Sequence, residues 1–199
     1  MKSKIIILLE IFLLFIVLPL LLFFGIVPFQ WWPRVLEFGL ILAVLISIFH
    51  KTSLKELGLR TDNLKESLVC FGGVTFFGIL ALLLLRRLVN YQTSNAVLWW
   101  QNPFVYYMVF LNDPIQEFIY RGFLMERIKK LFCSPVLVIA TNIIIFAFVH
   151  IIFRDPYLLI FVFISGLVWA WAYYKYPNVF AVALSHAILG GVAMILGLT

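Results

Sequence analysis

Hydrophobic residues occur along this chain in long runs that short polar segments separate. A helix needs about 20 residues to cross the ~30 Å hydrocarbon core of a bilayer. By that measure, the sequence has seven candidate spans, at residues 5–29, 35–50, 67–85, 103–125, 135–152, 157–174 and 178–198. Backbone groups in lipid need partners within their own segment, and these runs do not alternate as barrel strands do. The pattern therefore predicts an all-α, polytopic transmembrane helix bundle of about seven spans, or eight if one is missed.

Composition narrows the class of protein further. The 199 residues are 64% hydrophobic and 12% charged, whereas a soluble domain is about half apolar and a quarter charged. The net charge of +6 comes from lysines and arginines scattered between the apolar runs, which is typical of membrane loops and not of a nucleic-acid surface. Cys70 and Cys133 lie far apart and suit packing. We expect a lipid bilayer around the protein and no nucleic-acid partner, and the oligomeric state is left open.

The distribution of basic residues predicts the orientation. The first run is too long for the core of a signal peptide, so we expect it to remain as a transmembrane helix. With the N-terminus inside, ten basic residues lie on the inner side and four on the outer side, with Arg121 set aside as intramembrane. The inner ones are Lys2, Lys4, Lys51, Lys55, Arg60, Lys65, Arg127, Lys129, Lys130 and Lys175, and the outer ones are Arg34, Arg86, Arg87 and Arg154. We expect an integral protein of a prokaryotic cytoplasmic (inner) membrane.

Three of the later apolar runs carry ionisable residues that could form one site: Glu117 and Arg121 in the fourth, His150 in the fifth and His186 in the seventh. An acid or arginine at the centre of a membrane helix costs roughly 2.5–3.5 kcal/mol, so such residues persist where they pair or line a polar cavity. Glu117 and Arg121 are four residues apart and share one helix face. We therefore expect a cavity resembling an active site between spans 4, 5 and 7. Glu10, near the start of the first run, is expected to reach the interface or another helix.

Each of these residues also has a structural interpretation. Glu117 and Arg121 could form an ion pair that only stabilises the bundle, and His150 could be an interfacial residue near a helix end. His186 lies in mid-span and needs a polar partner. Two histidines and a carboxylate could bind zinc, or they could activate a water by general base catalysis. No H-E-x-x-H arrangement is present, so we expect no cofactor and keep zinc as the less favoured alternative.

Neighbouring residues could support such a site. Asp113-Pro114 interrupts the fourth run, where a proline removes a backbone hydrogen bond and often kinks the helix. Gln116 shares a helix face with Tyr120. Asn142 lies in the middle of the fifth run, where it could form an interhelical hydrogen bond or face the site.

Three motifs, in this order, resemble those of the CPBP family, also called the Abi or type II CAAX-protease family of intramembrane endopeptidases. The family has E-E-x-x-x-R on one helix, F-x-x-x-H on the next, and H-x-x-x-N or H-x-x-x-D two helices further on. The corresponding residues here are 116–121, 146–150 and 186–190. The resemblance covers about residues 52–196. It implies a family core at 52–199, preceded by N-terminal transmembrane helices at 1–51.

The resemblance implies a glutamate-dependent proteolytic site within the membrane. In the family, the first glutamate and the F-x-x-x-H histidine activate a water that attacks a peptide carbonyl. The last histidine and its asparagine stabilise the oxyanion. Carried over by position, the catalytic residues are Gln116, Glu117, Arg121, His150 and His186, and the supporting residues are Tyr120, Phe146, Asn142 and Gly190. The implied substrate is a membrane-associated or C-terminally tailed protein or peptide.

Two departures from the family pattern open two alternatives. The first glutamate is replaced by Gln116, whose amide cannot act as a general base, and the last asparagine by Gly190, which has no side-chain donor. Either Glu117 takes over as the base on a rotated or kinked helix, or the chain is a catalytically silent relative that binds a membrane partner. A transporter or channel is less favoured, because no inverted repeat of broken helices is visible.

Overall fold

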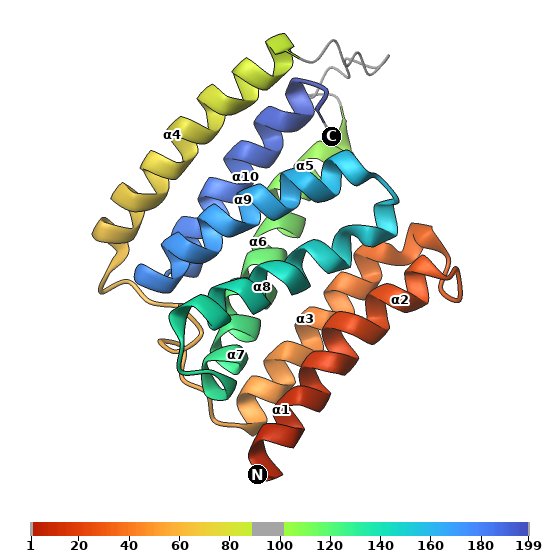
Figure 1. The fold of residues 1–199 in the computed structure, drawn as a ribbon, viewed down its shortest axis with the longest axis vertical. Helices are drawn as coiled ribbons and strands as arrows, with labels where there is room; N and C mark the ends of the chain where they lie inside the picture. Colours follow the sequence, from red (N-terminus) through yellow and green to blue (C-terminus); the bar gives the residue numbers. More distant parts are fainter. Residues whose placement is uncertain (1, 89–101, 199) are drawn as a thin grey trace.

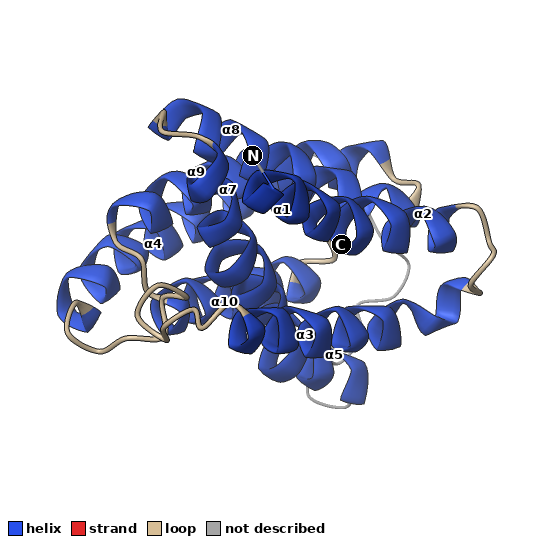
Figure 2. Ribbon diagram, turned by 90° about the horizontal axis from the view of Figure 1, so that it is seen from below, coloured by secondary structure: helices blue, strands red, loops and turns tan. Residues whose placement is uncertain are grey.

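The computed structural model describes residues 2–88 and 102–198, and every regular element in these residues is a helix (Figure 2). The helices are α1 (Lys2–Phe12), α2 (Leu18–Phe23), α3 (Trp32–Phe49), α4 (Leu64–Leu88), α5 (Pro103–Tyr107), α6 (Asp113–Glu117), α7 (Met125–Leu131), α8 (Pro135–Val149), α9 (Pro156–Lys175) and α10 (Val179–Ile195). Wider π-helical turns join α1 to α2, α5 to α6 and α6 to α7. Residues 103–131 thus form one continuous helix, called the central helix below. The all-α prediction is confirmed, with seven helical stretches in the described residues.

Most of these stretches have the length and hydropathy of membrane spans. Five are long and apolar enough to cross a bilayer: Lys4–Phe23, Phe29–Phe49, Leu64–Leu88, Pro135–Phe153 and Pro156–Lys175. Val179–Ile195 is a shorter apolar helix. The central helix is not among them, and it carries Asp113, Glu117 and Arg121. The chain is therefore an integral membrane protein whose apolar helices follow the order of the hydrophobic runs.

Two predicted helix boundaries were wrong. The first helix ends at Phe23 and not at residue 29, because Gly25 takes a left-handed conformation (φ 71°) that turns the chain. The fourth continues to Leu131 and not only to residue 125. Glu126 and Arg127, which mark the predicted end, are buried and contact each other at 3.4 Å, so these polar side chains do not terminate the helix.

The helices run alternately up and down, so that the two ends of the chain lie at opposite ends of the bundle (Figure 1). Figure 1 shows α4 at one edge and α1, α2 and α3 at the other, with α6 and α10 between them. The loops 50–63, 132–134 and 176–178 lie at the same end as the N-terminus. This end therefore carries the larger group of basic residues, as the ten-against-four distribution requires.

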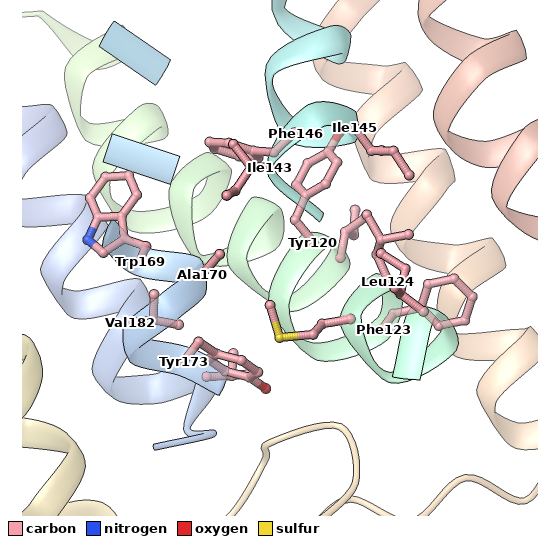
Figure 3. Packing of buried hydrophobic residues seen from close by; sticks show 14 of the residues in the cluster. Tyr120, Phe123, Leu124, Ile143, Ile145, Phe146, Trp169, Ala170, Tyr173 and Val182 are labelled. Carbon is pink, nitrogen blue, oxygen red and sulfur yellow. The ribbon is translucent and has the colours of Figure 1, made fainter. Parts of the chain in front are cut away.

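The core lies where the first helical stretch (α1, α2 and the π turn between them), the central helix and α8 meet. The ring of Tyr120 packs between Phe15 and Phe146, with centroids 5.4 and 5.1 Å away. One turn further along the central helix, Phe123 and Leu124 are fully buried (Figure 3). Large apolar side chains on the outer faces of the bundle are exposed instead, which is the arrangement that lipid favours over water.

Glu10 bonds to other helices within the bundle. Its Oε1 lies 2.7 Å from Nε2 of His50 on the C-terminal end of α3, and its Oε2 lies 3.5 Å from Nε of Arg127 on α7. Arg127 is 1% exposed and needs an anionic partner at that depth. Of the two predicted positions for Glu10, contact with another helix is the one observed, and it ties the N-terminal helices to the central helix.

The segment after α3, residues 50–63, docks through its backbone against the end of the core that lies near the N-terminus. The carbonyl of Leu57 accepts a hydrogen bond from the Tyr173 hydroxyl at 3.3 Å, and the carbonyl of Gly58 accepts one from the Val179 amide at 2.9 Å. Gly58 has φ 73°, a conformation that glycine adopts without steric cost. A Cβ at Gly122 would lie only 2.8 Å from the Leu57 carbonyl, so this glycine permits the close approach of segment and central helix.

Replacing Gly58 by alanine is expected to lower the melting temperature of the purified protein in detergent. A Cβ there would lie 1.9 Å from the Tyr173 hydroxyl, and the left-handed backbone alone costs a non-glycine residue about 1–2 kcal/mol. Gly72→Ala in α4 is the control, because its Cβ meets nothing within 4 Å. Alanine favours helix by about 1 kcal/mol over glycine, so this control should keep or raise the melting temperature. Equal melting temperatures for both variants would contradict the assigned role of Gly58.

Candidate active site

Two π-helical turns surround the short helix α6 in the middle of the central helix. They lie at Met108–Asn112 and Phe118–Leu124, before and after Asp113-Pro114. Pro114 lies near the start of α6 but in the interior of the continuous central helix, where it has no N–H to donate to the preceding turn. Each wide turn shifts the register of the following side chains, and such turns are frequent at functional sites. The predicted disruption at this proline therefore takes the form of π turns within a continuous helix.

The predicted pair of Glu117 and Arg121 is present and completely buried. Nε of Arg121 lies 3.4 Å from Oε2 of Glu117, and both side chains are 0% exposed. A buried charge of either sign is costly unless it is paired and hydrogen-bonded. The arginine therefore balances a carboxylate that has no access to lipid or solvent.

Arg121 is held by three further contacts from neighbouring helices. Its Nη1 donates to Oδ1 of Asn142 on α8, and its Nη2 donates to the carbonyl of Gly166 on α9 at 3.3 Å. The guanidinium also lies 4.6 Å from the ring centroid of Phe146. Asn142 in turn donates from Nδ2 to the Tyr120 carbonyl at 2.7 Å. Of the two predicted roles for Asn142, the observed one is an interhelical hydrogen bond.

The two histidines of the motifs are each fixed through Nδ1. Nδ1 of His186 lies 2.7 Å from Oε1 of Glu117, and Nδ1 of His150 lies 2.7 Å from the carbonyl of Phe146. A carbonyl oxygen can only accept, and so can the carboxylate of the Glu117–Arg121 ion pair. Nδ1 therefore carries the proton in both rings. In the neutral form of each imidazole, Nε2 is then an unprotonated base.

Aromatic packing holds the same two rings in place. The indole of Trp169 lies 4.4 Å from the ring of His186, and its Nε1 donates to Ser185 at 3.1 Å. The ring of Phe146 lies 5.0 Å from His150 and 6.4 Å from His186, so it packs near both imidazoles. His150 is at the end of α8, yet it reaches the site because α8 crosses the central helix obliquely (Figure 1).

A cavity of about 1050 Å³ lies beside these groups, with mostly apolar walls. Its polar lining includes Asp113, Gln116, His150 and His186, and Gly190 also lies on its wall. The predicted cavity was placed between spans 4, 5 and 7, and the observed one extends further. Side chains of α2, α3 and α4, among them Leu22, Leu36 and Phe77, form its apolar walls. Of the predicted site residues, Tyr120 and Phe146 also line the cavity, whereas Glu117, Arg121 and Asn142 are buried behind it.

Asp113 is a further candidate residue of the site, although it lies outside the three family motifs. It is 3% exposed, its Oδ1 lies 3.4 Å from Nδ2 of Asn112, and its Oδ2 has no hydrogen-bond partner in the described part of the chain. A Cβ on Gly190 would lie 3.0 Å from this Oδ2 and 3.9 Å from Cδ2 of His186. The signal was present in the sequence, because Asp113 is one helical turn before Gln116 and Glu117.

The arrangement of possible metal ligands bears on the zinc alternative. In residues 2–88 and 102–198, no group of three His, Cys, Asp or Glu side chains lies in an arrangement that could hold a metal ion. The observed arrangement thus does not fit a resident zinc ion, and the chemistry below uses only the side chains and a water.

Fold and site together define a polytopic membrane protein with titratable groups gathered at an internal cavity. Residues 98–192 match the family model of the Rce1-like type II CAAX prenyl endopeptidases. This part of the chain is a domain of that family, the CPBP family of membrane proteases, as the three motifs predict. The matched segment contains every polar residue of the candidate site. No curated protein and no solved structure matches the chain.

Proposed function

We propose that this protein is an intramembrane endopeptidase that hydrolyses a peptide bond of a membrane-associated or C-terminally tailed protein or peptide. The observation that carries the proposal is the 2.7 Å contact between Glu117 and His186 beside the cavity, inside a domain of a membrane-protease family. A buried carboxylate that fixes one nitrogen of an imidazole leaves the other nitrogen as an oriented base. This pairing is the standard means by which a histidine is prepared for proton transfer.

In the proposed reaction, Nε2 of His186 takes a proton from a water while the water oxygen attacks the scissile carbonyl. Glu117 stabilises the imidazolium that forms, and Arg121 keeps Glu117 ionised throughout. The amide of Gln116, which lines the cavity, donates a hydrogen bond to the developing oxyanion. The imidazolium then returns its proton to the amine as the C–N bond breaks. His150 presents a second acceptor nitrogen, which binds the N–H of the substrate backbone.

The apolar walls of the cavity support a substrate that brings an apolar group with it. The family name refers to prenylated CAAX proteins, so a farnesylated CAAX peptide is the first probe to use. Single-span membrane peptides without a lipid group form the second set. We further propose that the N-terminus lies in the cytoplasm, because the basic loops lie at its end of the bundle.

Purified wild-type protein is expected to cleave a probe from one of these two sets in detergent or liposomes. His186→Ala is expected to lower kcat roughly 10²–10⁴-fold, the usual contribution of general base catalysis. His150→Ala should act mainly on KM, because the proposal places it against the substrate backbone. Mass spectrometry of the products identifies the bond that is cut. Equal cleavage by wild type and His186→Ala would contradict the proposal.

One observation favours a second candidate function, a catalytically silent relative that binds a membrane partner. Gln116 faces the cavity at the position where the family carries a glutamate. If the protein is silent, wild type cuts neither set of probes and Gln116→Glu creates activity. Under the endopeptidase proposal, wild type cuts before any such change.

A further inference from the structure

We propose that Asp113 is a catalytic residue that holds the attacking water together with His186, so that a carboxylate and an amide have exchanged places in this site. The inference rests on the proposed endopeptidase function and deepens it. The family pattern has a carboxylate at position 116 and, in the H-x-x-x-N form of its last motif, an amide at position 190. Here the amide belongs to Gln116, and the carboxylate of Asp113 occupies the space beside Gly190.

Gly190 leaves the space that the Asp113 carboxylate occupies. A Cβ on residue 190 would lie 3.0 Å from Oδ2 of Asp113, closer than most real Cβ contacts, so an asparagine there would require the carboxylate to move. The same point lies 3.9 Å from Cδ2 of His186, the ring carbon bonded to Nε2. The carboxylate and the free edge of the imidazole therefore border one small volume, and both line the cavity.

The contacts of Asp113 differ from those of Glu117, the other buried carboxylate of the candidate site. Glu117 is engaged by Arg121 and His186, and it does not line the cavity. Asp113 has no arginine or lysine within ion-pair distance among the described residues, and its Oδ2 accepts no hydrogen bond. A buried acceptor without a partner is costly and calls for a ligand that can donate. A water on Nε2 of His186 can donate its second hydrogen to this oxygen.

With these two acceptors, both hydrogens of the attacking water have a partner before and during the reaction. The water donates one hydrogen to Oδ2 of Asp113 and the other to Nε2 of His186, so its lone pair points toward the substrate carbonyl. When the C–O bond forms, the second hydrogen moves as a proton to Nε2. The amine receives that proton when the C–N bond breaks. Asp113 keeps its own charge and stabilises the imidazolium from the side opposite Glu117.

The test compares two aspartates of the same cavity. Asp113→Asn keeps the shape and removes the charge, and it is expected to lower kcat at least 100-fold with little change in KM. Asp155→Asn is the matched control, because Asp155 also lines the cavity but its Oδ1 caps α9 by accepting from the amides of Tyr157 and Leu158. Asparagine is an equally good cap, so this variant should keep wild-type activity. Melting temperatures in detergent confirm that both variants fold.

The proposed exchange of carboxylate and amide leads to a second expectation. Gly190→Asn alone should abolish cleavage, because the new side chain displaces the Asp113 carboxylate. The triple variant Asp113→Ala, Gln116→Glu and Gly190→Asn restores the family arrangement and should recover activity above that of Asp113→Ala. A merely structural role for Asp113 would give no such recovery.

The outcomes separate this inference from the proposed function. If wild type cleaves, His186→Ala does not, and Asp113→Asn cleaves as well as wild type, the assignment of Asp113 is overturned and the endopeptidase stands. If wild type cuts neither farnesylated CAAX peptides nor single-span membrane peptides while Gln116→Glu does, both claims fail. If none of the proteins cuts these probes, including Gln116→Glu, both claims fail as well. Loss of kcat in Asp113→Asn with an unchanged Asp155→Asn supports both.

Discussion

Arg121→Met is expected to destabilise the protein by about 3–5 kcal/mol, the largest loss of stability that a single substitution in the bundle should cause. The methionine fills a similar volume but leaves Glu117 as a buried charge without its cation. It also removes the hydrogen bonds to Asn142 and to the carbonyl of Gly166. The measurement is the free energy of unfolding in mixed micelles, obtained from a denaturant series.

The same experiment has a control and an internal test. Lys130 and Glu126 form another pair at i, i+4 on the central helix, but the lysine side chain is 41% exposed. Lys130→Met should therefore cost no more than about 1 kcal/mol. Adding Glu117→Gln to Arg121→Met should recover part of the lost stability, because the substituted pair then leaves no uncompensated charge of its own. If the double variant is less stable than Arg121→Met, the charge pair is not the origin of the loss.

This pair also shows what the sequence could and could not predict. The spacing of four residues within an apolar run was enough to predict that Glu117 and Arg121 share a helix face and pair. The helix order followed from hydrophobic runs of adequate length, because the bilayer imposes that length on every span. These features depend on local periodicity alone.

Other features depend on contacts between distant segments, which periodicity does not encode. Glu10 meets His50 and Arg127 only because three helix ends converge. Glu117 could be read as a replacement base, but its contact with His186 through Nδ1 places it behind the cavity. The wider turns around α6 decide which side chains reach that cavity, and the sequence marked them only through Pro114.

Glu117→Gln is expected to lower kcat about as strongly as His186→Ala, on the order of 10³-fold, and the two losses should not add. In the proposed reaction the carboxylate acts only through the imidazole, by accepting the proton on Nδ1. A glutamine can present its N–H₂ to Nδ1 instead, which would favour the tautomer with the proton on Nε2. That tautomer has no free base toward the cavity. Once His186 is absent, Glu117 has no imidazole left to orient.

The measurement is a double-mutant cycle on kcat with Glu117→Gln, His186→Ala and the combination. Because Glu117→Gln also leaves Arg121 without its anion, the rates are divided by the folded fraction at the assay temperature. Ser185→Ala is the control, since it removes a neighbouring polar group on α10 that bonds Trp169 and Thr75 but lies outside the proposed proton path. It should change kcat less than 10-fold. Losses that multiply in the combined variant would show that Glu117 and His186 act separately. Another group would then have to accept the proton from the water, and the candidates that line the cavity are Asp113 and His150.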